Sequence, residues 1–307
     1  MFSDVNAKRL LAILAVVCAS ATATVATDWL WQVTTDPAGD NEPSWSPDGT
    51  TIAFMSSRSG NLDIWTIPAG GGTPTQVTTD TAADGSASWS PDGTTIAFSS
   101  TRSGNFDIWT IPAGGGACTQ ITTDPAWDWS PSWSPDGTTI AFSSTRSGND
   151  DVWTIPAGGG TPTQITTDTA DDGFPSWSPD GTTIAFESDR SGNWDIWTIP
   201  AGGGTATQIT TDPAEDYDAS WSPDGTTIAF TSARSGNWDI WTVPAGGGTA
   251  TQVTTDPDYD GWPSWSPDGT TIAFMSSRSG NTDIWCIKPD YASIAPASLG
   301  EIKATFK

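Results

Sequence analysis

A single motif repeats through most of the chain. Ser-Trp-Ser-Pro-Asp-Gly-Thr-Thr-Ile-Ala-Phe occurs six times, and each copy begins 44 residues after the previous one. A period of this length, held without drift, indicates one supersecondary unit copied six times. Most of the sequence therefore describes a scaffold, and residues that carry function should be sought where the copies differ. The tryptophans that mark the period are Trp45, Trp89, Trp133, Trp177, Trp221 and Trp265.

Each copy contains four short β-like segments joined by turn residues. In the first copy these segments are residues 44–46, 51–56, 63–67 and 75–79. Pro, Asp and Gly stand between them, where Pro sets φ and Gly tolerates positive φ. Six units of four short strands predict an all-β fold: a six-bladed β-propeller of four-stranded blades.

The two ends of the repeat predict how the ring closes. The sixth copy stops after its third strand, at Ile287, and has no fourth. Residues 31–35 match the fourth strand of the first copy, with Trp31 in the place of Thr75. We expect this N-terminal strand to complete the last blade, because doing so removes two open sheet edges.

The segments before and after the repeat differ from it in kind. A basic pair precedes the apolar run 10–17 and small residues at 19–23, which is the layout of a secretory signal peptide. The run is too short to span a bilayer. Cys18 leaves a lipid anchor as the alternative to plain export, although Val17 stands where a bacterial lipobox has Gly, Ala or Ser. We expect a signal peptide at 1–23, the propeller at 24–290 and a tail at 291–307, in a periplasmic or extracellular protein without a transmembrane span.

The charge of the chain excludes one class of partner and favours another. It has 36 Asp and Glu, 11 Lys and Arg, and a formal net charge of −25. Binding to nucleic acid is driven by Lys and Arg, so no nucleic-acid partner is expected. The same field favours cationic ligands and metal ions.

The sequence offers few of the residue types that enzymes use for catalysis. The chain contains no His, which excludes Ser-His-Asp and Cys-His catalysis and His-ligated zinc sites. Paired carboxylates could still hydrolyse glycosides. Because nearly every Asp recurs in each copy, whereas a catalytic pair would break the symmetry, we expect no enzymatic activity. A carboxylate-based carbohydrate enzyme is the remaining enzymatic alternative.

The repeated segments resemble a known family. Ser-Pro-Asp-Gly before Ile-Ala-Phe, then Arg-Ser-Gly-Asn-x-Asp-Ile-Trp, then Gln-Val-Thr-Thr, is similar to the TolB-like (WD40-like) β-propeller repeat over roughly residues 31–290. The family includes TolB of the bacterial envelope and the non-catalytic propeller of prolyl-oligopeptidase-like peptidases. TolB has an α/β domain before its propeller and the peptidases add a hydrolase domain, but no Gly-x-Ser-x-Gly elbow occurs here. The resemblance implies a stand-alone exported propeller with protein contacts at the envelope.

One Asp in each copy lies between an outer strand and the next inner strand. These segments should converge near the central channel, where a ring of carboxylates could bind Ca²⁺ or another hard cation. One Arg per copy should emerge on the same face, so structural Asp–Arg pairing is the interpretation we prefer, with a channel cation as the alternative. The acidic residues are Asp40, Asp84, Asp128, Asp172, Asp216 and Asp260, and the basic ones are Arg58, Arg102, Arg146, Arg190, Arg234 and Arg278.

The copies differ mainly before each Ser-Trp-Ser and before each Asp-Ile-Trp. The turns expected on the opposite face hardly change, so the variation is confined to one face, here called the variable face. Aromatic residues exposed on a rigid scaffold mark recognition sites. We expect a monomer whose variable face binds a protein or peptide, with a glycan as the alternative ligand and core filling as the alternative role for the rings. The aromatic residues are Phe106, Trp127, Trp129, Phe174, Trp194, Tyr217, Trp238, Tyr259 and Trp262, accompanied by the acidic Glu42, Asp171, Glu215 and Asp258.

Overall fold

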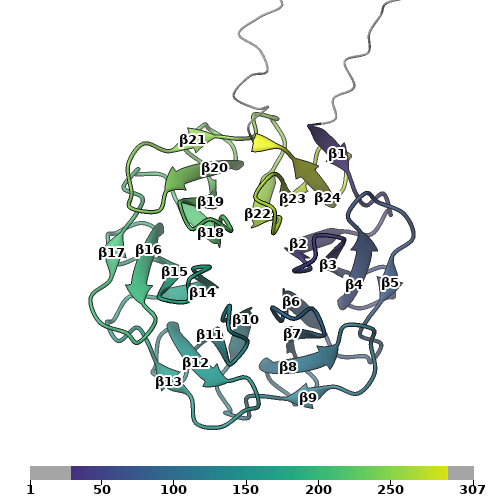
Figure 1. The fold of residues 1–307 in the computed structure, drawn as a ribbon, viewed down its shortest axis with the longest axis horizontal. Helices are drawn as coiled ribbons and strands as arrows, with labels where there is room; N and C mark the ends of the chain where they lie inside the picture. Colours follow the sequence, from purple (N-terminus) through teal and green to yellow (C-terminus); the bar gives the residue numbers. More distant parts are fainter. Residues whose placement is uncertain (1–28, 290–307) are drawn as a thin grey trace, which may run out of the picture.

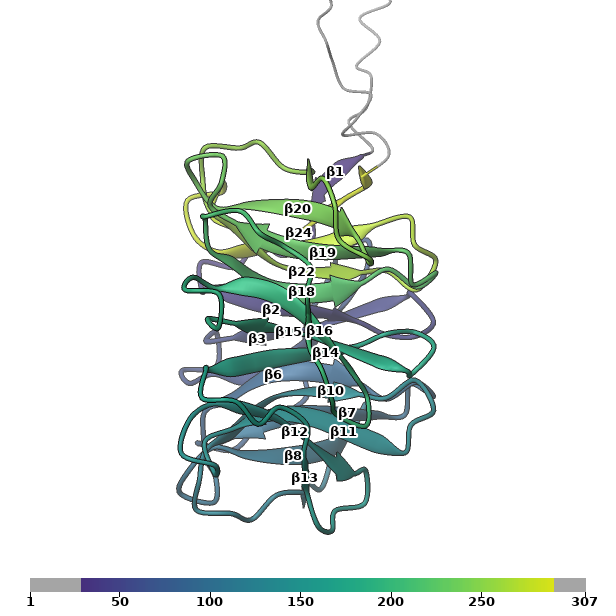
Figure 2. The same cartoon turned by 90° about the vertical axis from the view of Figure 1, so that its left-hand side faces the viewer.

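Six antiparallel sheets of four strands form a closed ring in the computed structural model, which describes residues 29–289 (Figure 1). Seen edge on, the ring is a disc with loops on its two faces (Figure 2). The six-bladed propeller expected from the repeat is confirmed. The expected signal peptide, Cys18 and the tail lie outside the described residues.

In five blades the strands run from the centre of the disc to its rim in chain order, and in the sixth the rim strand is β1 (Leu30–Gln32). The first blade has β2 (Asp40–Trp45), β3 (Thr51–Ser56), β4 (Asp63–Pro68) and β5 (Thr75–Gln76). The second has β6 (Asp84–Trp89), β7 (Thr95–Ser100), β8 (Asp107–Pro112) and β9 (Thr119–Gln120). The third has β10 (Asp128–Trp133), β11 (Thr139–Ser144), β12 (Asp151–Pro156) and β13 (Thr163–Gln164). The fourth has β14 (Asp172–Trp177), β15 (Thr183–Ser188), β16 (Asp195–Pro200) and β17 (Thr207–Gln208). The fifth has β18 (Asp216–Trp221), β19 (Thr227–Ser232), β20 (Asp239–Pro244) and β21 (Thr251–Gln252). The sixth has β22 (Asp260–Trp265), β23 (Ile272–Ser276), β24 (Asp283–Ile287) and β1 (Leu30–Gln32).

The first strand of the described chain closes the ring as expected. β1 pairs antiparallel with β24, and Trp31 lies opposite Cys286. In the first blade Thr75 lies opposite Thr66, the residue equivalent to Cys286. Trp31 therefore occupies the Thr75 position, and β1 gives the last blade its fourth strand by covering the outer edge of β24.

The inner strands are longer than the sequence predicted, and the outer strands are shorter. β2 begins at Asp40 rather than at Ser44, and β5 ends at Gln76 rather than at Thr79. A bulge between Asn41 and Ser44 lets the inner strand continue past a residue with positive φ. The strand signal is hidden at this point because the bulged residues do not alternate in polarity. Asp40 and its equivalents are consequently strand residues and not loop residues.

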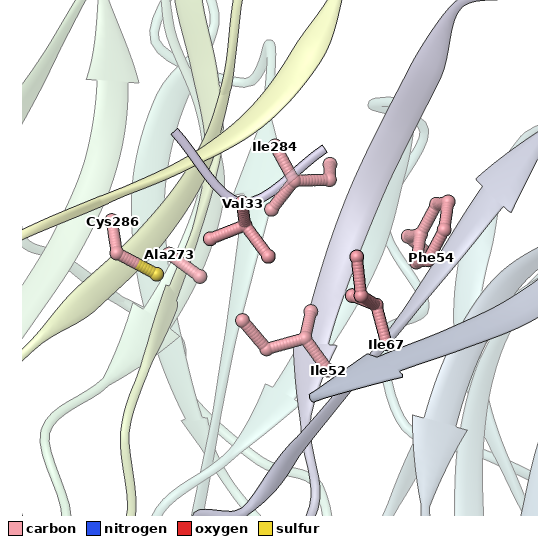
Figure 3. Close-up of a cluster of buried hydrophobic side chains, with 7 residues drawn as sticks. All are labelled: Val33, Ile52, Phe54, Ile67, Ala273, Ile284 and Cys286. Atoms are coloured by element: carbon pink, nitrogen blue, oxygen red, sulfur yellow. The ribbon is translucent and has the colours of Figure 1, made fainter. Parts of the chain in front are cut away.

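The hydrophobic core lies between neighbouring blades. Ile52, Phe54 and Ile67 of the first blade pack against Cys286 and neighbouring side chains of the last blade (Figure 3). Five further clusters repeat this arrangement around the ring. Each fully buried Phe or Ile stabilises the fold by roughly 1.5–3 kcal/mol. Interfaces of this kind hold the variable loops on a fixed scaffold.

Within residues 29–289, no helix has the length and apolar character needed to cross a membrane.

Candidate binding face

The six repeated Asp residues that begin the inner strands are buried and paired with arginine. Asp40 Oδ2 lies 2.5 Å from Arg58 Nη2, and the other five blades repeat the pair at 2.6–2.8 Å. The Arg58 guanidinium lies 5.1 Å from the ring centres of both Phe54 and Trp65. Burial raises the pKa of Asp40, while hydrogen bonds from Ser56 and Arg58 oppose the shift. The pairing therefore holds each variable loop to its own blade.

This pairing is the structural role that the sequence favoured for the Asp ring. In the part of the chain that the structure describes, no group of three or more Asp, Glu or Cys residues is placed to hold a metal ion. Each carboxylate faces the arginine of its own blade, so the six do not act as one ligand set. Calcium binding at Asp40 and its equivalents stays a prediction.

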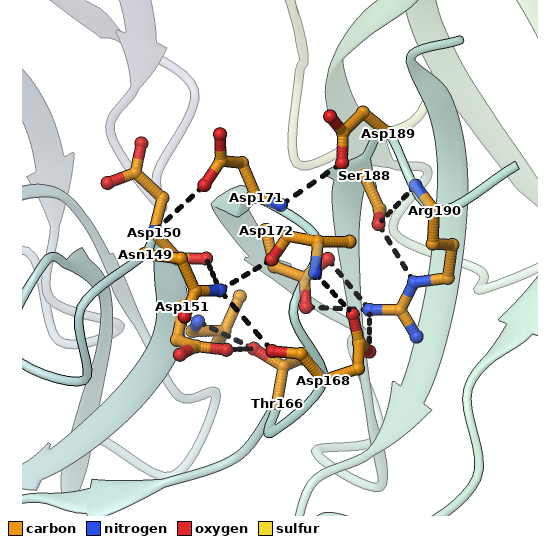
Figure 4. Close-up of polar contacts among 12 residues, drawn as sticks. Asn149, Asp150, Asp151, Thr166, Asp168, Asp171, Asp172, Ser188, Asp189 and Arg190 are labelled. Atoms are coloured by element: carbon orange, nitrogen blue, oxygen red, sulfur yellow. Dashed lines mark hydrogen bonds and ion pairs between the residues drawn. The ribbon is translucent and has the colours of Figure 1, made fainter. Parts of the chain in front are cut away.

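Hydrogen bonds fix the variable loops to one another as well. In the loop network of the third and fourth blades, Asn149 Nδ2 donates to the carbonyl of Ala170 at 2.6 Å (Figure 4). The backbone N–H of Asp150 donates to Asp171 Oδ1 at 3.2 Å. Asp171 donates in turn from its own N–H to Asp189. Side chains on this face are thus presented by ordered loops, which lowers the entropy cost of binding.

Four of the nine aromatic residues expected on the variable face line one cavity. Phe106, Trp127, Trp129 and Phe174 surround a volume of about 520 Å³. Trp127 is 57% exposed, and its ring packs edge-on against Phe106 at 6.2 Å. Trp129, Phe174 and Phe106 are half-buried. The structure therefore brings these four side chains together as one apolar surface, here called the aromatic pocket.

The other five aromatic residues form a continuous row along the opposite half of the face. Successive ring centres are 5.5–6.3 Å apart, a spacing at which aromatic rings attract one another. All five are half-buried. In this half of the face, aromatic side chains occupy the space that corresponds to the open aromatic pocket in the other half. Its members are, in order, Trp194, Tyr217, Trp238, Tyr259 and Trp262.

Small residues line the aromatic pocket on the side of the second blade. Ala83, Gly85 and Ser86 line it from the second blade. In the fifth blade, the position of Gly85 is taken by Tyr217, whose ring belongs to the row. The chain therefore makes an asymmetric face on a symmetric scaffold.

The third residue of each inner strand lines the central channel. These residues sit at the strand bulge with φ between 51° and 58°, a conformation that side chains other than Gly seldom adopt. They enclose a cavity of about 140 Å³ together with neighbouring Pro and Ala residues. Glu42, Ser86, Ser130 and Phe174 line both this channel and the aromatic pocket, so the two spaces adjoin. The six residues are Glu42, Ser86, Ser130, Phe174, Asp218 and Trp262.

Three carboxylates near the channel have raised pKa values. Burial raises the pKa of Asp218 to about 7; the charge of Glu42 adds to the shift, and Thr231 opposes it. Burial also raises the pKa of Glu42. Glu187 has its pKa raised well above its usual value, first by burial and then by the charge of Asp218. The channel is therefore acidic and poorly solvated.

Sequence reasoning selected Glu42 but missed Asp218, Glu187 and Ser130. The sequence does not indicate Asp218 and Ser130, because it is the bulge that places the third residue of the inner strand in the channel. The pattern of polar and apolar residues does not predict such a bulge. Glu187 had a signal that could have been used: it is the charged member of a position otherwise held by Met, Ser and Thr. Those equivalents are Met55, Ser99, Ser143, Thr231 and Met275.

The sequence matches the model of the TolB beta propeller domain over residues 22–129, 124–220 and 214–305. The chain belongs to this family. No curated protein matches the sequence significantly.

Solved structures share the fold at low identity. A putative TolB from Agrobacterium tumefaciens is 22% identical, with a TM-score of 0.68 over 84% of this chain and 96% of that one. TolB from Acinetobacter baumannii is 21% identical, with a TM-score of 0.62, covering 81% of this chain and 63% of that one. Oligogalacturonate lyase from Vibrio parahaemolyticus is 13% identical, with a TM-score of 0.61 over 86% and 94%. At these identities the likenesses show a shared fold.

Proposed function

We propose that this TolB-family propeller is an exported, non-catalytic binding protein that holds a protein or peptide partner at the cell envelope through its variable face. The aromatic pocket carries the proposal. Leu62 and Trp127 are the exposed large hydrophobic residues within residues 29–289, at 37% and 57%, and both line this one cavity. Exposed apolar side chains gathered in a concave site mark recognition of a partner.

The walls of the pocket suit a peptide side chain. A large apolar group can fill the space between Phe106 and Trp129, and aromatic anchors of this kind dominate binding energies at interfaces. Asp150 lines the same cavity and adds negative charge at its edge. An extended peptide with an apolar side chain and a cationic one therefore fits the surface.

Selection from a phage library of random linear peptides, with the chain lacking residues 1–23 as bait, tests the proposal. Enriched peptides should bind the parent protein and lose about tenfold or more in affinity for Trp127→Ser, because an exposed aromatic anchor is removed. Trp127 donates its backbone N–H to Thr145, a contact that the substitution leaves in place.

Glu215→Ser is the matched control, because Glu215 occupies the position of Trp127 two copies later and is exposed. Its affinity should match that of the parent protein. Peptides that bind Trp127→Ser as well as the parent would overturn the pocket as the binding site. A glycan array run on the same variants tests the lectin alternative, which is favoured if sugars bind in a Trp127-dependent way and peptides do not.

A further inference from the structure

Four of the six bulge residues around the channel carry a side-chain oxygen that can accept a hydrogen bond: Glu42, Ser86, Ser130 and Asp218. Glu42, Ser130 and Asp218 occupy the same strand position in the first, third and fifth blades. The inner strands surround the channel at regular intervals (Figure 1). The three residues therefore form a triangle around its axis.

Ser130 provides an acceptor that the protein itself does not use. Its side chain is buried, with the residue 8% exposed, and its hydroxyl has no hydrogen-bond partner among residues 29–289. Ser130 lines both the channel and the aromatic pocket. A buried hydroxyl without a partner on the wall of a cavity points to a ligand, because buried polar groups are otherwise satisfied.

The negative charges at the channel exceed what the fold requires. Glu42 and Glu187 each accept a hydrogen bond from a bulge N–H of the next blade, that of Ser86 at 2.7 Å and that of Asp218 at 3.1 Å. Neutral hydroxyls do the same work elsewhere, as Ser99 does for the N–H of Ser130. A carboxylate is therefore not needed for this contact.

No basic side chain within residues 29–289 neutralises these carboxylates. The six arginines there are paired with aspartates of their own blades. Lys288 lies over the ring of Trp31 in the closing blade. Glu42, Glu187 and Asp218 form no ion pair in this part of the chain, so a cationic ligand would supply the missing charge.

We propose that Glu42, Ser130 and Asp218 bind a primary ammonium group in the channel, with the apolar chain of the same ligand lying in the aromatic pocket. An ammonium carries three N–H donors and no acceptor, which matches three acceptors set in a triangle. Because four residues line both cavities, one ligand can have its ammonium group in the channel and its apolar chain in the aromatic pocket. The inference rests on the proposed function for the use of the pocket and adds the chemistry of the ligand.

Titration calorimetry with n-hexylamine and 1-hexanol tests the ammonium site. Hexylamine should bind the parent protein at least about tenfold more tightly than hexanol, because only the amine makes charge-assisted hydrogen bonds. Glu42→Gln and Asp218→Asn should each weaken hexylamine by about tenfold while leaving hexanol unchanged. Both substitutions keep an oxygen that can accept the hydrogen bonds of the parent residue.

Glu215→Gln removes one charge from an exposed position of the same face and is the control. It should change hexylamine affinity by less than about twofold. Equal weakening by Glu215→Gln, equal affinity for hexylamine and hexanol, or no binding of hexylamine would each overturn the proposal. Binding of both probes in a Trp129-dependent manner, with no effect of Glu42→Gln, would overturn the ammonium site and leave the proposed function standing.

The source of the ammonium group is tested with peptides from the phage selection. Replacement of their lysine by norleucine, together with acetylation of the amino terminus, should weaken binding to the parent protein and not to Glu42→Gln. That result assigns the group to a peptide partner. If Glu42→Gln and Asp218→Asn weaken hexylamine binding as expected, but the peptides bind equally well without their amino groups, the ligand is a free amine. Peptides whose affinity is also unchanged by Trp127→Ser would contradict the proposed function itself.

Discussion

Glu42 of the first blade accepts a hydrogen bond from the backbone N–H of Ser86 in the second blade at 2.7 Å. In later blades the equivalent bulge N–H donates to a side chain on the second strand of the preceding blade, as Phe174 does to Ser143 at 2.9 Å. The corresponding strand residue in the first blade is Met55, whose thioether is a weak acceptor. Glu42 thus replaces a missing hydroxyl and places a carboxylate at the channel.

Substitutions at Glu42 should separate its hydrogen bond from its charge. Glu42→Gln keeps an acceptor for the Ser86 N–H, whereas Glu42→Ala leaves that donor unpaired. The Ala variant should be less stable than the Gln variant by about 1–3 kcal/mol. Guanidinium chloride unfolding at pH 8 measures the difference. Equal stabilities would mean that water or another group satisfies Ser86.

Asp218→Asn should change how stability depends on pH. The pKa of Asp218 is about 7 in the folded protein, against 3.8 for an ordinary Asp. The folded state therefore holds a proton that the unfolded chain releases, so the contribution of Asp218 is most favourable below pH 3.8 and is lost as the pH rises to 7. The Asn variant should gain stability relative to the parent protein across this range, with a constant difference above it.

Melting temperatures of both proteins at several pH values check this prediction. The pKa values of Glu42 and Glu187, which lie near Asp218, are also raised, so the difference between variant and parent is the quantity to follow. Glu215→Gln serves as the control for loss of one charge. A difference between Asp218→Asn and the parent that does not vary between pH 4 and 8 would contradict the shifted pKa.

The Asp40–Arg58 pair should matter chiefly for stability. Arg58→Met leaves Asp40 buried without its partner and should cost about 3–5 kcal/mol. The double variant Asp40→Asn with Arg58→Met should be less destabilised than the sum of the two single variants, because the pair interacts directly. Denaturant unfolding of the three proteins completes the cycle. Additive costs would show that the pair is not coupled.

Metal removal tests the alternative role of the Asp ring. Because each carboxylate already faces an arginine, EDTA should change the melting temperature by less than about 1 °C, and excess calcium should have no larger effect. Differential scanning calorimetry with and without each reagent provides the comparison. Stabilisation of several degrees by calcium would instead assign a cation to Asp40 and its equivalents.

The repeat predicted the fold well, because a 44-residue period and turn chemistry leave few alternatives. The exchange of β1 into the last blade also followed from the sequence, since the sixth copy lacks a fourth strand and residues 31–35 supply one. The start of β2 did not follow. Its bulge interrupts the alternation of polarity, so the sequence pattern places Asp40 in a loop.

The variable face was predicted as a set of residues but not as a shape. Trp127 and Tyr217 both appear as variable aromatic residues, yet one is exposed beside a cavity and the other is stacked within a row. The difference depends on neighbours in the adjacent blade, such as Gly85, which a one-dimensional pattern does not reveal. Asp218 was missed for the same reason, because its place in the channel arises from the backbone at the bulge.

Fluorine NMR of protein labelled with 5-fluorotryptophan tests the binding face most directly. Resonances of Trp127 and Trp129, assigned with Trp→Phe variants, should shift on titration with a phage-selected peptide. The resonance of Trp45, which donates to the Ser264 carbonyl between blades, should stay in place. A peptide that binds with unchanged Trp127 and Trp129 resonances would contradict the account.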